Sequence, residues 1–208
     1  MRLSISMPCY HRPKRTIRAI ESIAKQNING WEALVVGDGC PFMADYITSN
    51  YFSDIVNDCN SRGNSMLISN LSENKGGYGY YITNMNIQRA TGKYFTFMAN
   101  DDDIAENHFQ NYLSGIEDTD YDFVYFNSFI EPYASIRNTH LQFGGIGHSE
   151  LIVRTDFIQK MPQHDGQYGH DWSLIQNMIM NSTKNTKVVS MPTYIVKGIG
   201  NSRFDEID

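Results

Sequence analysis

The chain has 208 residues, of which 41% are hydrophobic and 19% charged, a composition typical of one globular domain with a full hydrophobic core. The formal net charge is −6 and no basic run stands out, which argues against tight, non-specific binding to nucleic acid. No apolar stretch approaches the roughly 20 residues that a membrane-spanning helix requires, and the N-terminal apolar stretch is too short for a signal peptide. Cys9, Cys40 and Cys59 are odd in number and form no C-x-x-C pair, so we expect reduced thiols and a cytoplasmic location.

The first half of the sequence alternates between short apolar runs and amphipathic segments. Strands are predicted at residues 3–7, 33–36, 65–68 and 94–98, the first of them stopped by Pro8. Helices are predicted between these strands, at residues 16–25, 43–52 and 80–90. This alternation predicts an α/β fold in which a mostly parallel sheet is flanked by helices and joined by right-handed crossovers.

The second half begins with the same alternation and then changes. A helix is predicted at residues 105–116 and a strand at residues 122–127. After about residue 128 the predicted elements are strands at 149–153, 188–191 and 194–196 and helices at 156–161 and 171–180. Because the sequence contains neither a linker nor an internal repeat, residues 1–208 are expected to form a single domain.

Three consecutive aspartates, Asp101, Asp102 and Asp103, follow the predicted strand at residues 94–98. Two like charges about 4 Å apart repel each other by about 4 kcal/mol at an effective dielectric constant of 20. A hard divalent cation such as Mg²⁺ or Mn²⁺ would offset this repulsion. The alternative is an acidic turn that begins a helix, since Asp103 and Glu106 have the spacing of a capping box. Ligands bind beyond the carboxyl ends of parallel strands, which is where the aspartates fall, and this position favours the metal site.

Six short segments of the sequence, none of them specific alone, are informative about the family when their order and spacing are taken together. They are MPCYHRP, VVGDGC, NKGGYG, ATGKYFTFMANDDD, GHSELIVRTDFIQKM and GHDWSL. Together they resemble the family 2 glycosyltransferases of the GT-A fold over nearly the whole chain. The resemblance implies a Rossmann-like α/β fold with a small acceptor-side subregion, in which residues up to about 103 bind a nucleotide sugar and the rest bind the acceptor. The implied activity is transfer of a sugar from a nucleotide-diphosphate sugar to an acceptor hydroxyl, with inversion.

The resemblance also implies which residues bind the donor nucleotide. Tyr10 would stack on or flank the base, and Arg12 would contact phosphate or, alternatively, hold an acidic side chain at the surface. Asp38 would hydrogen-bond the base edge or the ribose, unless it only forms an Asx turn. The family often has two aspartates at this point, so the single carboxylate leaves the identity of the base open. The implied donor-binding residues are Pro8, Tyr10, Arg12, Asp38, Asn74, Gly76, Asn100 and Asp101.

The acidic cluster resembles the D-x-D site of this family, which binds a divalent ion together with the donor diphosphate. The register departs from the family pattern, because Ala99 or Asn100 stands where the first aspartate would fall in the tightest alignment. Asp101 and Asp103 are therefore the favoured metal ligands, with Asp102 close behind, and Mn²⁺ or Mg²⁺ is the implied cofactor.

On the acceptor side, the segment Gly169-His170-Asp171-Trp172 resembles the E-D-W segment of the family. Asp171 matches the position of the base that takes the proton from the acceptor hydroxyl. Its alternative role is the N-cap of a helix. His148, His170 and Trp172 are implied acceptor-side residues, although Trp172 would also suit the core and His170 the rim. If Asp171 is not the base, then His170, Asp165 and Glu150 are the next candidates.

Two other functions remain open at this point. A sugar-phosphate nucleotidyltransferase would also be metal-dependent, but it would carry a G-x-G-x-R loop after the first strand, where this chain has Cys9-Tyr10-His11-Arg12-Pro13. A non-catalytic module that binds nucleotide sugars would keep the fold without turnover. The expected partners are a nucleotide-diphosphate sugar and a glycan or other hydroxyl-bearing acceptor, and nucleic acid is expected only as a modified-base acceptor.

Overall fold

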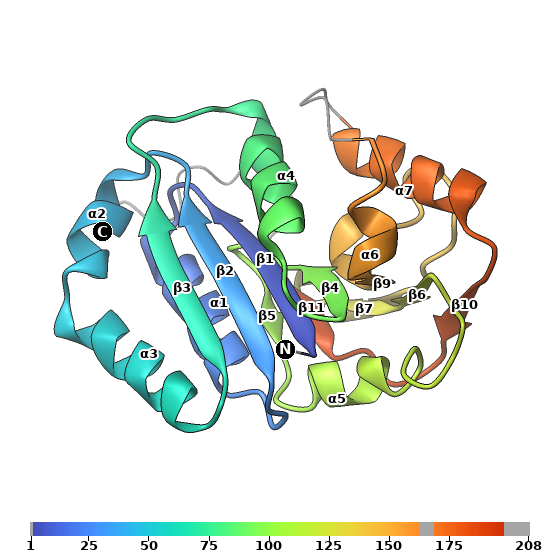
Figure 1. The fold of residues 1–208 in the computed structure, drawn as a ribbon, viewed down its shortest axis with the longest axis horizontal. Helices are drawn as coiled ribbons and strands as arrows, with labels where there is room; N and C mark the ends of the chain where they lie inside the picture. Colours follow the sequence, from blue (N-terminus) through green and yellow to red (C-terminus); the bar gives the residue numbers. More distant parts are fainter. Residues whose placement is uncertain (1, 163–168, 198–208) are drawn as a thin grey trace.

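The computed structural model describes residues 2–162 and 169–197, and within these residues the strands form two sheets. The larger sheet has seven strands in the order β10-β6-β9-β4-β1-β2-β3 (Figure 1). Its strands are β1 (Leu3–Cys9), β2 (Trp31–Gly37), β3 (Ser65–Asn70), β4 (Tyr94–Phe97), β6 (Phe123–Phe126), β9 (Leu151–Arg154) and β10 (Asn185–Val188). The smaller sheet has the order β5-β11-β7-β8. Its strands are β5 (Asp103–Ile104), β7 (Ser128–Ile130), β8 (Ser135–Arg137) and β11 (Tyr194–Val196).

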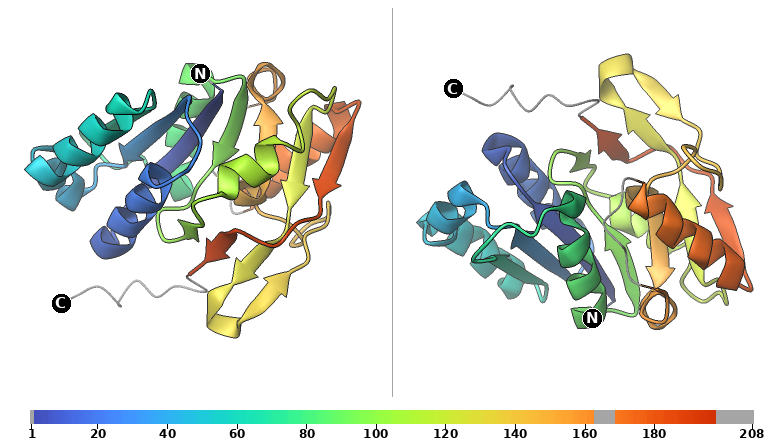
Figure 2. Two further views of the ribbon diagram at one scale, coloured as in Figure 1. Left: turned by 90° about the horizontal axis from the view of Figure 1, so that it is seen from below. Right: turned by 90° about the horizontal axis from the view of Figure 1, so that it is seen from above.

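Helices cover both faces of the larger sheet, with α1 on one face and α4 on the other (Figure 2). The described helices are α1 (Pro13–Ala24), α2 (Pro41–Ile47), α3 (Asn50–Ser61), α4 (Tyr80–Arg89), α5 (His108–Leu113), α6 (Thr155–Ile158) and α7 (His170–Asn181). Short 3₁₀ helices lie at Gly77–Gly79, Glu131–Tyr133 and His148–Glu150. This arrangement confirms the predicted α/β architecture.

Most strand pairs of the larger sheet are parallel. β1 pairs in parallel with β2 and β4, β2 pairs with β3, and β6 pairs with β10. β9 runs antiparallel between β4 and β6 and joins the two groups of parallel strands. The carboxyl ends of β1, β2, β3 and β4 therefore lie at one edge of the sheet, as the sequence predicts.

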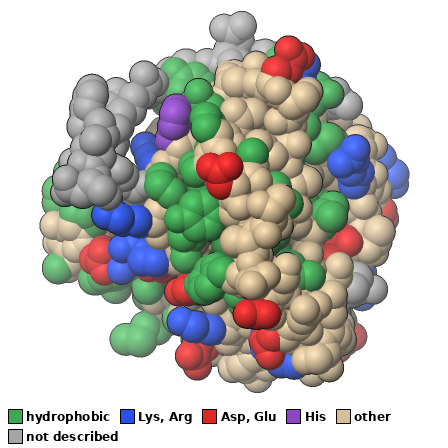
Figure 3. Space-filling view, turned by 90° about the vertical axis from the view of Figure 1, so that its left-hand side faces the viewer, with side chains coloured by type: hydrophobic (Ala, Val, Ile, Leu, Met, Phe, Trp, Pro, Cys, Tyr) green, Lys and Arg blue, Asp and Glu red, His purple; other side chains and the backbone are tan. Residues whose placement is uncertain are grey.

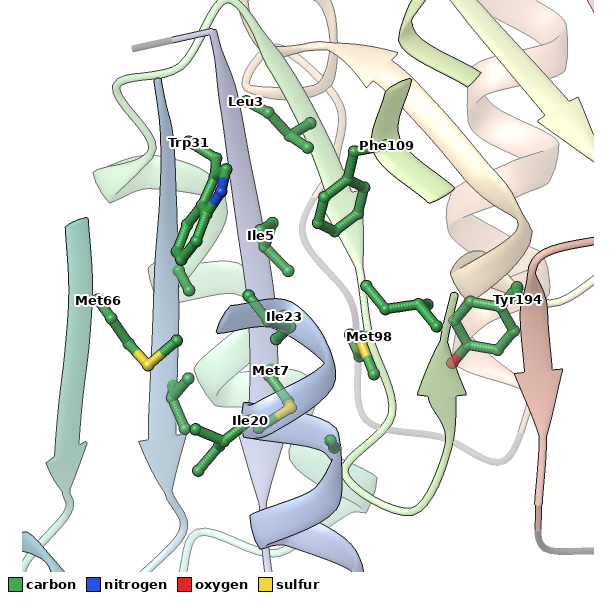
Figure 4. Packing of buried hydrophobic residues seen from close by; sticks show 14 of the residues in the cluster. Leu3, Ile5, Met7, Ile20, Ile23, Trp31, Met66, Met98, Phe109 and Tyr194 are labelled. Carbon is green, nitrogen blue, oxygen red and sulfur yellow. The ribbon is translucent and has the colours of Figure 1, made fainter. Parts of the chain in front are cut away.

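Two hydrophobic cores pack against the two faces of the sheet. One core joins the strands to α1, α2, α3 and α5, and Figure 4 shows Ile20 and Ile23 of α1 beside Ile5 and Met7 of β1. The other core joins the strands to α4, α6 and α7. Successive side chains of a strand point to opposite faces, so Tyr94 of β4 enters the first core and its neighbour Phe95 the second. Burial on both faces explains why the strands are continuous apolar runs in the sequence.

Several predicted elements differ from the structure in their boundaries. β1 was predicted to stop at Pro8 but continues to Cys9. The proline is tolerated because β4 pairs with β1 only as far as Ser6, so on that side there is no hydrogen bond between strands for Pro8 to interrupt. The predicted helix at residues 43–52 is two helices, α2 and α3, and α3 extends to Ser61. The predicted strand at residues 188–191 lies earlier, at Asn185–Val188.

The predicted capping box at Asp103 is wrong. Asp103 lies in strand β5, which pairs antiparallel with β11, and α5 begins only at His108 after Asn107 as its N-cap. The predicted start of this helix was too early, because the sequence contains no signal for a strand as short as β5. The hairpin of β7 and β8 was also not predicted.

Charged side chains of both signs share one face of the molecule. Figure 3 looks onto the face at the left of Figure 1, where lysine and arginine side chains are interspersed with aspartate and glutamate. Among the described residues, no helix combines the length and the apolar composition that crossing a membrane requires.

His108 is a buried titratable group in the first core, and it makes stability depend on pH. Its ring packs edge-on against Tyr112 and Phe126, and its Nδ1 lies 3.0 Å from Oγ1 of Thr193. Burial lowers the pKa of His108 to about 3. An unfolded histidine has a pKa of about 6.5, so below that pH the unfolded chain takes up a proton that the folded chain excludes.

We therefore expect the contribution of His108 to stability to be complete above pH 6.5 and to be lost as the pH falls from 6.5 toward 3. Between pH 7 and pH 5 the free energy of unfolding should fall by about 2 kcal/mol more in the unaltered chain than in His108→Gln. Urea denaturation at both pH values measures the difference. The control is His140→Gln at an exposed position, which should retain the unaltered pH dependence. The same profile for His108→Gln and the unaltered chain would contradict this account.

Candidate functional site

A pocket of about 530 Å³ opens where the parallel strands β1, β2 and β4 end. Four segments line it: the end of β1 with the turn that follows, the residue after β2, the loop between β3 and α4, and the residues after β4. The lining residues are Pro8, Cys9, Tyr10, Arg12, Asp38, Asn74, Gly76, Gly77, Tyr78, Gly79 and Asn100. Every predicted donor-binding residue except Asp101 is among them, so the structure gathers segments that are far apart in the sequence.

Asp38 holds three of these segments together. Its side chain is 4% exposed, and its two carboxylate oxygens accept hydrogen bonds from the backbone N–H groups of Lys75, at 2.7 Å, and Gly76, at 3.1 Å. Nδ2 of Asn74 donates to the backbone oxygen of Asp38 at 3.0 Å, and the N–H of Asp38 donates to the carbonyl of Cys9 at 2.8 Å. Asp38 therefore fixes the loop after β3 against the ends of β1 and β2.

The close approach of this loop requires the glycine that follows Asp38. Gly39 has a φ of +60°, and a Cβ atom at this position would lie 2.4 Å from the backbone nitrogen of Asn74. Any other residue would push the loop away from Asp38. The sequence predicted a turn here, and the structure adds that the turn is packed against backbone.

Two lining residues, Tyr78 and Gly79, were not predicted from the sequence. The run Gly76-Gly77-Tyr78-Gly79 carried a signal, because glycines permit left-handed backbone and close approach to a ligand. All four residues of this run have positive φ, including Tyr78 at 55°. The tyrosine side chain is 73% exposed.

Arg12 connects the pocket to the acidic cluster. Its Nη1 makes an ion pair with Oδ2 of Asp101, and the arginine itself lines the pocket. Asn100, the residue before the cluster, donates from Nδ2 to Oγ1 of Thr16 at 2.8 Å and so holds the start of α1 near β4. Asp101 therefore lies next to the pocket without lining it, with Arg12 between.

Asp102 and Asp103 have separate partners. Asp102 is buried and accepts hydrogen bonds from the hydroxyl of Tyr194, at 2.9 Å, and from the backbone N–H of Lys197, at 3.0 Å. Burial, and then the charge of neighbouring Asp101, raise the pKa of Asp102 to about 7. Asp103 pairs through Oδ2 with Nζ of Lys197 at 3.5 Å, while its Oδ1 is buried and has no hydrogen-bond partner among the described residues.

The carboxylate oxygens of the cluster suit a hard divalent cation. The three aspartates differ in how available they are to bind it, because their hydrogen-bond partners differ. Asp101 is next to the pocket and Asp103 has an oxygen without a partner in the described part of the chain, whereas both oxygens of Asp102 already accept hydrogen bonds. In the described part of the chain, no three His, Cys, Asp or Glu side chains gather closely enough to enclose a metal ion by themselves. An ion at this place would need further oxygen ligands, which a diphosphate can supply.

Two of the predicted acceptor-side residues, His148 and Trp172, are not among the residues that line the pocket. The ring of His148 is 4.8 Å from that of Phe97, at the carboxyl end of β4, and Trp172 packs edge-on against Phe143 at 6.3 Å. Helix α7 packs against the 3₁₀ helix that contains His148. The side chain of His170 and all of Asp165 lie outside the described residues.

Asp171 lies in the first turn of α7, and its Oδ1 accepts a hydrogen bond from the N–H of Trp172 at 2.9 Å. The N-cap of the helix is Gly169, so the alternative role of Asp171 as N-cap is wrong. A carboxylate in the first turn is stabilised by the helix dipole. The alternative base Glu150 is buried and bonded to Ser128 and to the N–H of Gly147, which gives it a structural role in the described fold.

Residues 4–178 match the family model described as "Glycosyl transferase family 2". The chain is 27% identical over 122 residues to the glycosyltransferase GlyG of Streptococcus pneumoniae, an alignment that covers 59% of this chain and 37% of GlyG. It is 24% identical over 122 residues to an uncharacterized glycosyltransferase of Rickettsia bellii, covering 59% of this chain and 16% of that protein. The chain therefore spans much less than the full length of these relatives.

Solved structures share the fold at low sequence identity. A crystal structure of S. aureus TarS superposes with a TM-score of 0.77 at 18% identity, covering 95% of this chain and 37% of TarS. TarS in complex with UDP-GlcNAc gives a TM-score of 0.74 at 15% identity, over 99% of this chain and 61% of that chain. The mannosyltransferase PcManGT of Pyrobaculum calidifontis, in complex with GDP-Man and Mn²⁺, gives 0.69 at 14% identity, over 98% and 58%. These likenesses establish the GT-A fold.

The role of Asp38 in holding the pocket predicts the effect of removing its carboxylate. Asp38→Ala leaves the N–H groups of Lys75 and Gly76 without acceptors, so we expect the free energy of unfolding to fall by about 1–3 kcal/mol. Amide hydrogen exchange at Lys75 and Gly76 should accelerate, and Asp38→Asn, which keeps one acceptor, should be intermediate. Asp54→Ala, at an exposed position of α3, is the control. Unchanged exchange at both amides in Asp38→Ala would show that another group holds the loop.

Proposed function

Because the chain belongs to glycosyl transferase family 2, we propose that it transfers a sugar from a nucleotide-diphosphate sugar to an acceptor hydroxyl. The observation that carries this proposal is the convergence of the predicted donor-binding residues on one pocket at the carboxyl edge of the sheet. Structural neighbours of the same fold are complexes with UDP-GlcNAc and with GDP-Man, which supports a nucleotide sugar as donor.

The chemistry of the lining residues supports one orientation of the donor in this pocket. Tyr10 and Asp38 offer an aromatic face and a carboxylate, which suit a base and a ribose. Arg12 and Asn100 offer donors of hydrogen bonds, and Arg12 also offers positive charge, which suits a diphosphate. The base would lie toward β2 and the diphosphate toward β4, with the anomeric carbon of the sugar near the acidic cluster.

We propose Asp101 and Asp103 as protein ligands of a divalent ion, with Asp102 as the least available of the three. A divalent ion bound there supplies positive charge that stabilises the departing diphosphate. The neighbour with bound GDP-Man also contains Mn²⁺, which supports a divalent ion in this fold, and either Mn²⁺ or Mg²⁺ suits carboxylate ligands.

We propose Asp171 as the base of an inverting reaction. Its carboxylate takes the proton from the acceptor hydroxyl while that oxygen attacks the anomeric carbon, and the nucleoside diphosphate leaves from the opposite face. Helix α7 places Asp171 on the same side of the sheet as His148, which lies at the end of β4. His148, His170 and Trp172 would then contact the acceptor, a glycan or another hydroxyl-bearing molecule. Residues up to about 103 would form the donor half and the remainder the acceptor half.

The remaining proposals concern alternatives and location. Family membership favours sugar transfer over a sugar-phosphate nucleotidyltransferase. A binding module without turnover would bind the donor but would fail to transfer or hydrolyse it. A cytoplasmic location is supported by Cys9, Cys40 and Cys59, which are free, buried thiols in the structure.

Donor binding can be tested by thermal stabilisation with a panel of nucleotide sugars that includes UDP-GlcNAc and GDP-Man, with and without Mn²⁺. A true donor at about 100 times its Kd should stabilise the fold by about 2.7 kcal/mol. Asp101→Asn should lose the part of this stabilisation that depends on Mn²⁺, because it removes a charged ligand next to Arg12. Asp54→Asn, at an exposed position, should behave like the unaltered chain. The donor proposal is wrong if no nucleotide sugar stabilises the chain, and the metal proposal is wrong if Asp101→Asn keeps the full Mn²⁺ effect.

The role of Asp171 can be separated from donor binding. A general base contributes a factor of about 10² to 10⁴ in rate, so Asp171→Asn should lose sugar transfer by that order. Its affinity for donor and Mn²⁺ should remain, because the base contacts only the acceptor. Transfer rate, donor Kd and melting temperature are measured on the same variant. Full transfer activity with an unchanged melting temperature would rule out Asp171 and direct attention to His170 and Asp165.

A further inference from the structure

The loop that lines the pocket between β3 and α4 carries an aromatic residue in a strained conformation. Gly76, Gly77, Tyr78 and Gly79 have φ angles of 67°, 61°, 55° and 80°. Glycine adopts such angles readily, but a left-handed backbone costs a residue with a Cβ atom about 1–2 kcal/mol. Strain of this kind concentrates at sites that bind ligands, so the position of Tyr78 calls for a functional explanation.

The surrounding contacts hold this loop in place on both sides of Tyr78. Before it, the N–H of Gly76 donates to the buried carboxylate of Asp38 at 3.1 Å. After it, Gly79 is pressed against Pro8, because a Cβ atom on Gly79 would lie 2.9 Å from Cβ of Pro8. The tyrosine is therefore presented on a loop fixed to the ends of β1 and β2.

The side chain of Tyr78 lines the pocket and is largely exposed there. It is 73% exposed, and it lines the pocket together with Tyr10, which is 44% exposed and comes from the turn after β1. Asp38, the proposed partner of the base or ribose, follows β2, which lies between β1 and β3 in the sheet. Arg12 forms an ion pair with Asp101, which follows β4. The positive charge of Arg12 is therefore on the side of the pocket proposed for the diphosphate.

We propose that Tyr78 is a further donor-binding residue, whose ring stacks on the nucleobase of the nucleotide sugar. The aromatic face of a tyrosine stacks on any base, and removing one such contact weakens binding by about 5- to 150-fold. The strained, fixed loop presents the ring before the nucleotide arrives, so little ordering is required on binding. This inference rests on the proposed function, because it assumes that a nucleotide occupies the pocket.

The test is calorimetric titration of UDP, GDP and inorganic pyrophosphate into the unaltered chain and three variants. Tyr78→Gly should weaken binding of the nucleoside diphosphate by about 5- to 150-fold and leave binding of pyrophosphate unchanged, because only the base is lost as a contact. Tyr78→Phe should retain nucleotide affinity, since stacking needs the ring and not the hydroxyl. Asp118→Gly is the matched control: Asp118 also has a positive φ, of 60°, but it is exposed and does not line the pocket.

Melting temperatures separate binding from folding. Glycine relieves the left-handed strain in both Tyr78→Gly and Asp118→Gly, so neither variant should melt at a lower temperature than the unaltered chain by more than a few degrees. If Tyr78→Gly does not fold, Tyr78→Asn carries the same test, since asparagine also tolerates this conformation.

The possible results distinguish the two proposals. Equal affinity of Tyr78→Gly and the unaltered chain for UDP or GDP would overturn the stacking role and leave the proposed function standing. Equal weakening of pyrophosphate binding would also overturn it, because the loop rather than the ring would then be responsible. If neither UDP nor GDP binds the unaltered chain, the proposed function fails and the role of Tyr78 fails with it.

Discussion

The buried carboxylate of Asp38 is the interaction on which the shape of the pocket depends. Parallel strands end together at one edge, but the loops that follow them are free to diverge. Asp38 prevents this by accepting two backbone hydrogen bonds from a loop more than thirty residues further along the chain, at separations of 37 and 38 residues. A buried charged acceptor that lost these partners would be costly, so the loop and the carboxylate are stable only together. The pocket wall is thus built from backbone and held by one side chain.

The three aspartates after β4 illustrate how the fold accommodates crowded like charges. Each carboxylate has a different neighbour: the guanidinium of Arg12 for Asp101, the hydroxyl of Tyr194 for Asp102, and the ammonium of Lys197 for Asp103. The smaller sheet makes this division possible, because β5 and β11 place Asp103 opposite the strand that leads to Lys197. Positive charge from two distant parts of the chain therefore surrounds the cluster before any ligand is present.

Much of the fold was predictable because both faces of the sheet are buried. Strands such as β2 are apolar at nearly every position, and α1 shows apolar residues at helical spacing, so each was found to within a few residues. Elements that depend on partners far along the chain were not found. β5 is only two residues long and exists because β11 pairs with it, and α3 has a largely polar sequence whose buried residues include Phe52 and Cys59. Local sequence contains no record of such pairings.

For the pocket, too, positions set by the strands were predictable, and positions set by distant contacts were not. Tyr10, Asp38 and Asn100 come shortly after strands and lie in the pocket lining, because the ends of the strands fix their positions. Tyr78 was missed because its position depends on the path of a loop, and that path is set by Asp38 and Pro8 rather than by its neighbours. The separate partners of Asp101, Asp102 and Asp103 were missed for the same reason.

The antiparallel strand β9 has a consequence for how the chain is made. β4 is flanked by β1 on one side and by β9 on the other, yet β9 is synthesised long after β4. Until Leu151–Arg154 leaves the ribosome, one edge of β4 has unpaired backbone groups, and such an edge can pair with another chain. Phe95 and Phe97 of β4, which are buried in the finished fold, would also lack the part of their core that β9, α6 and α7 supply. The open edge of the sheet formed by β1 to β4 is therefore covered only after β9, a strand from much later in the chain, has been made.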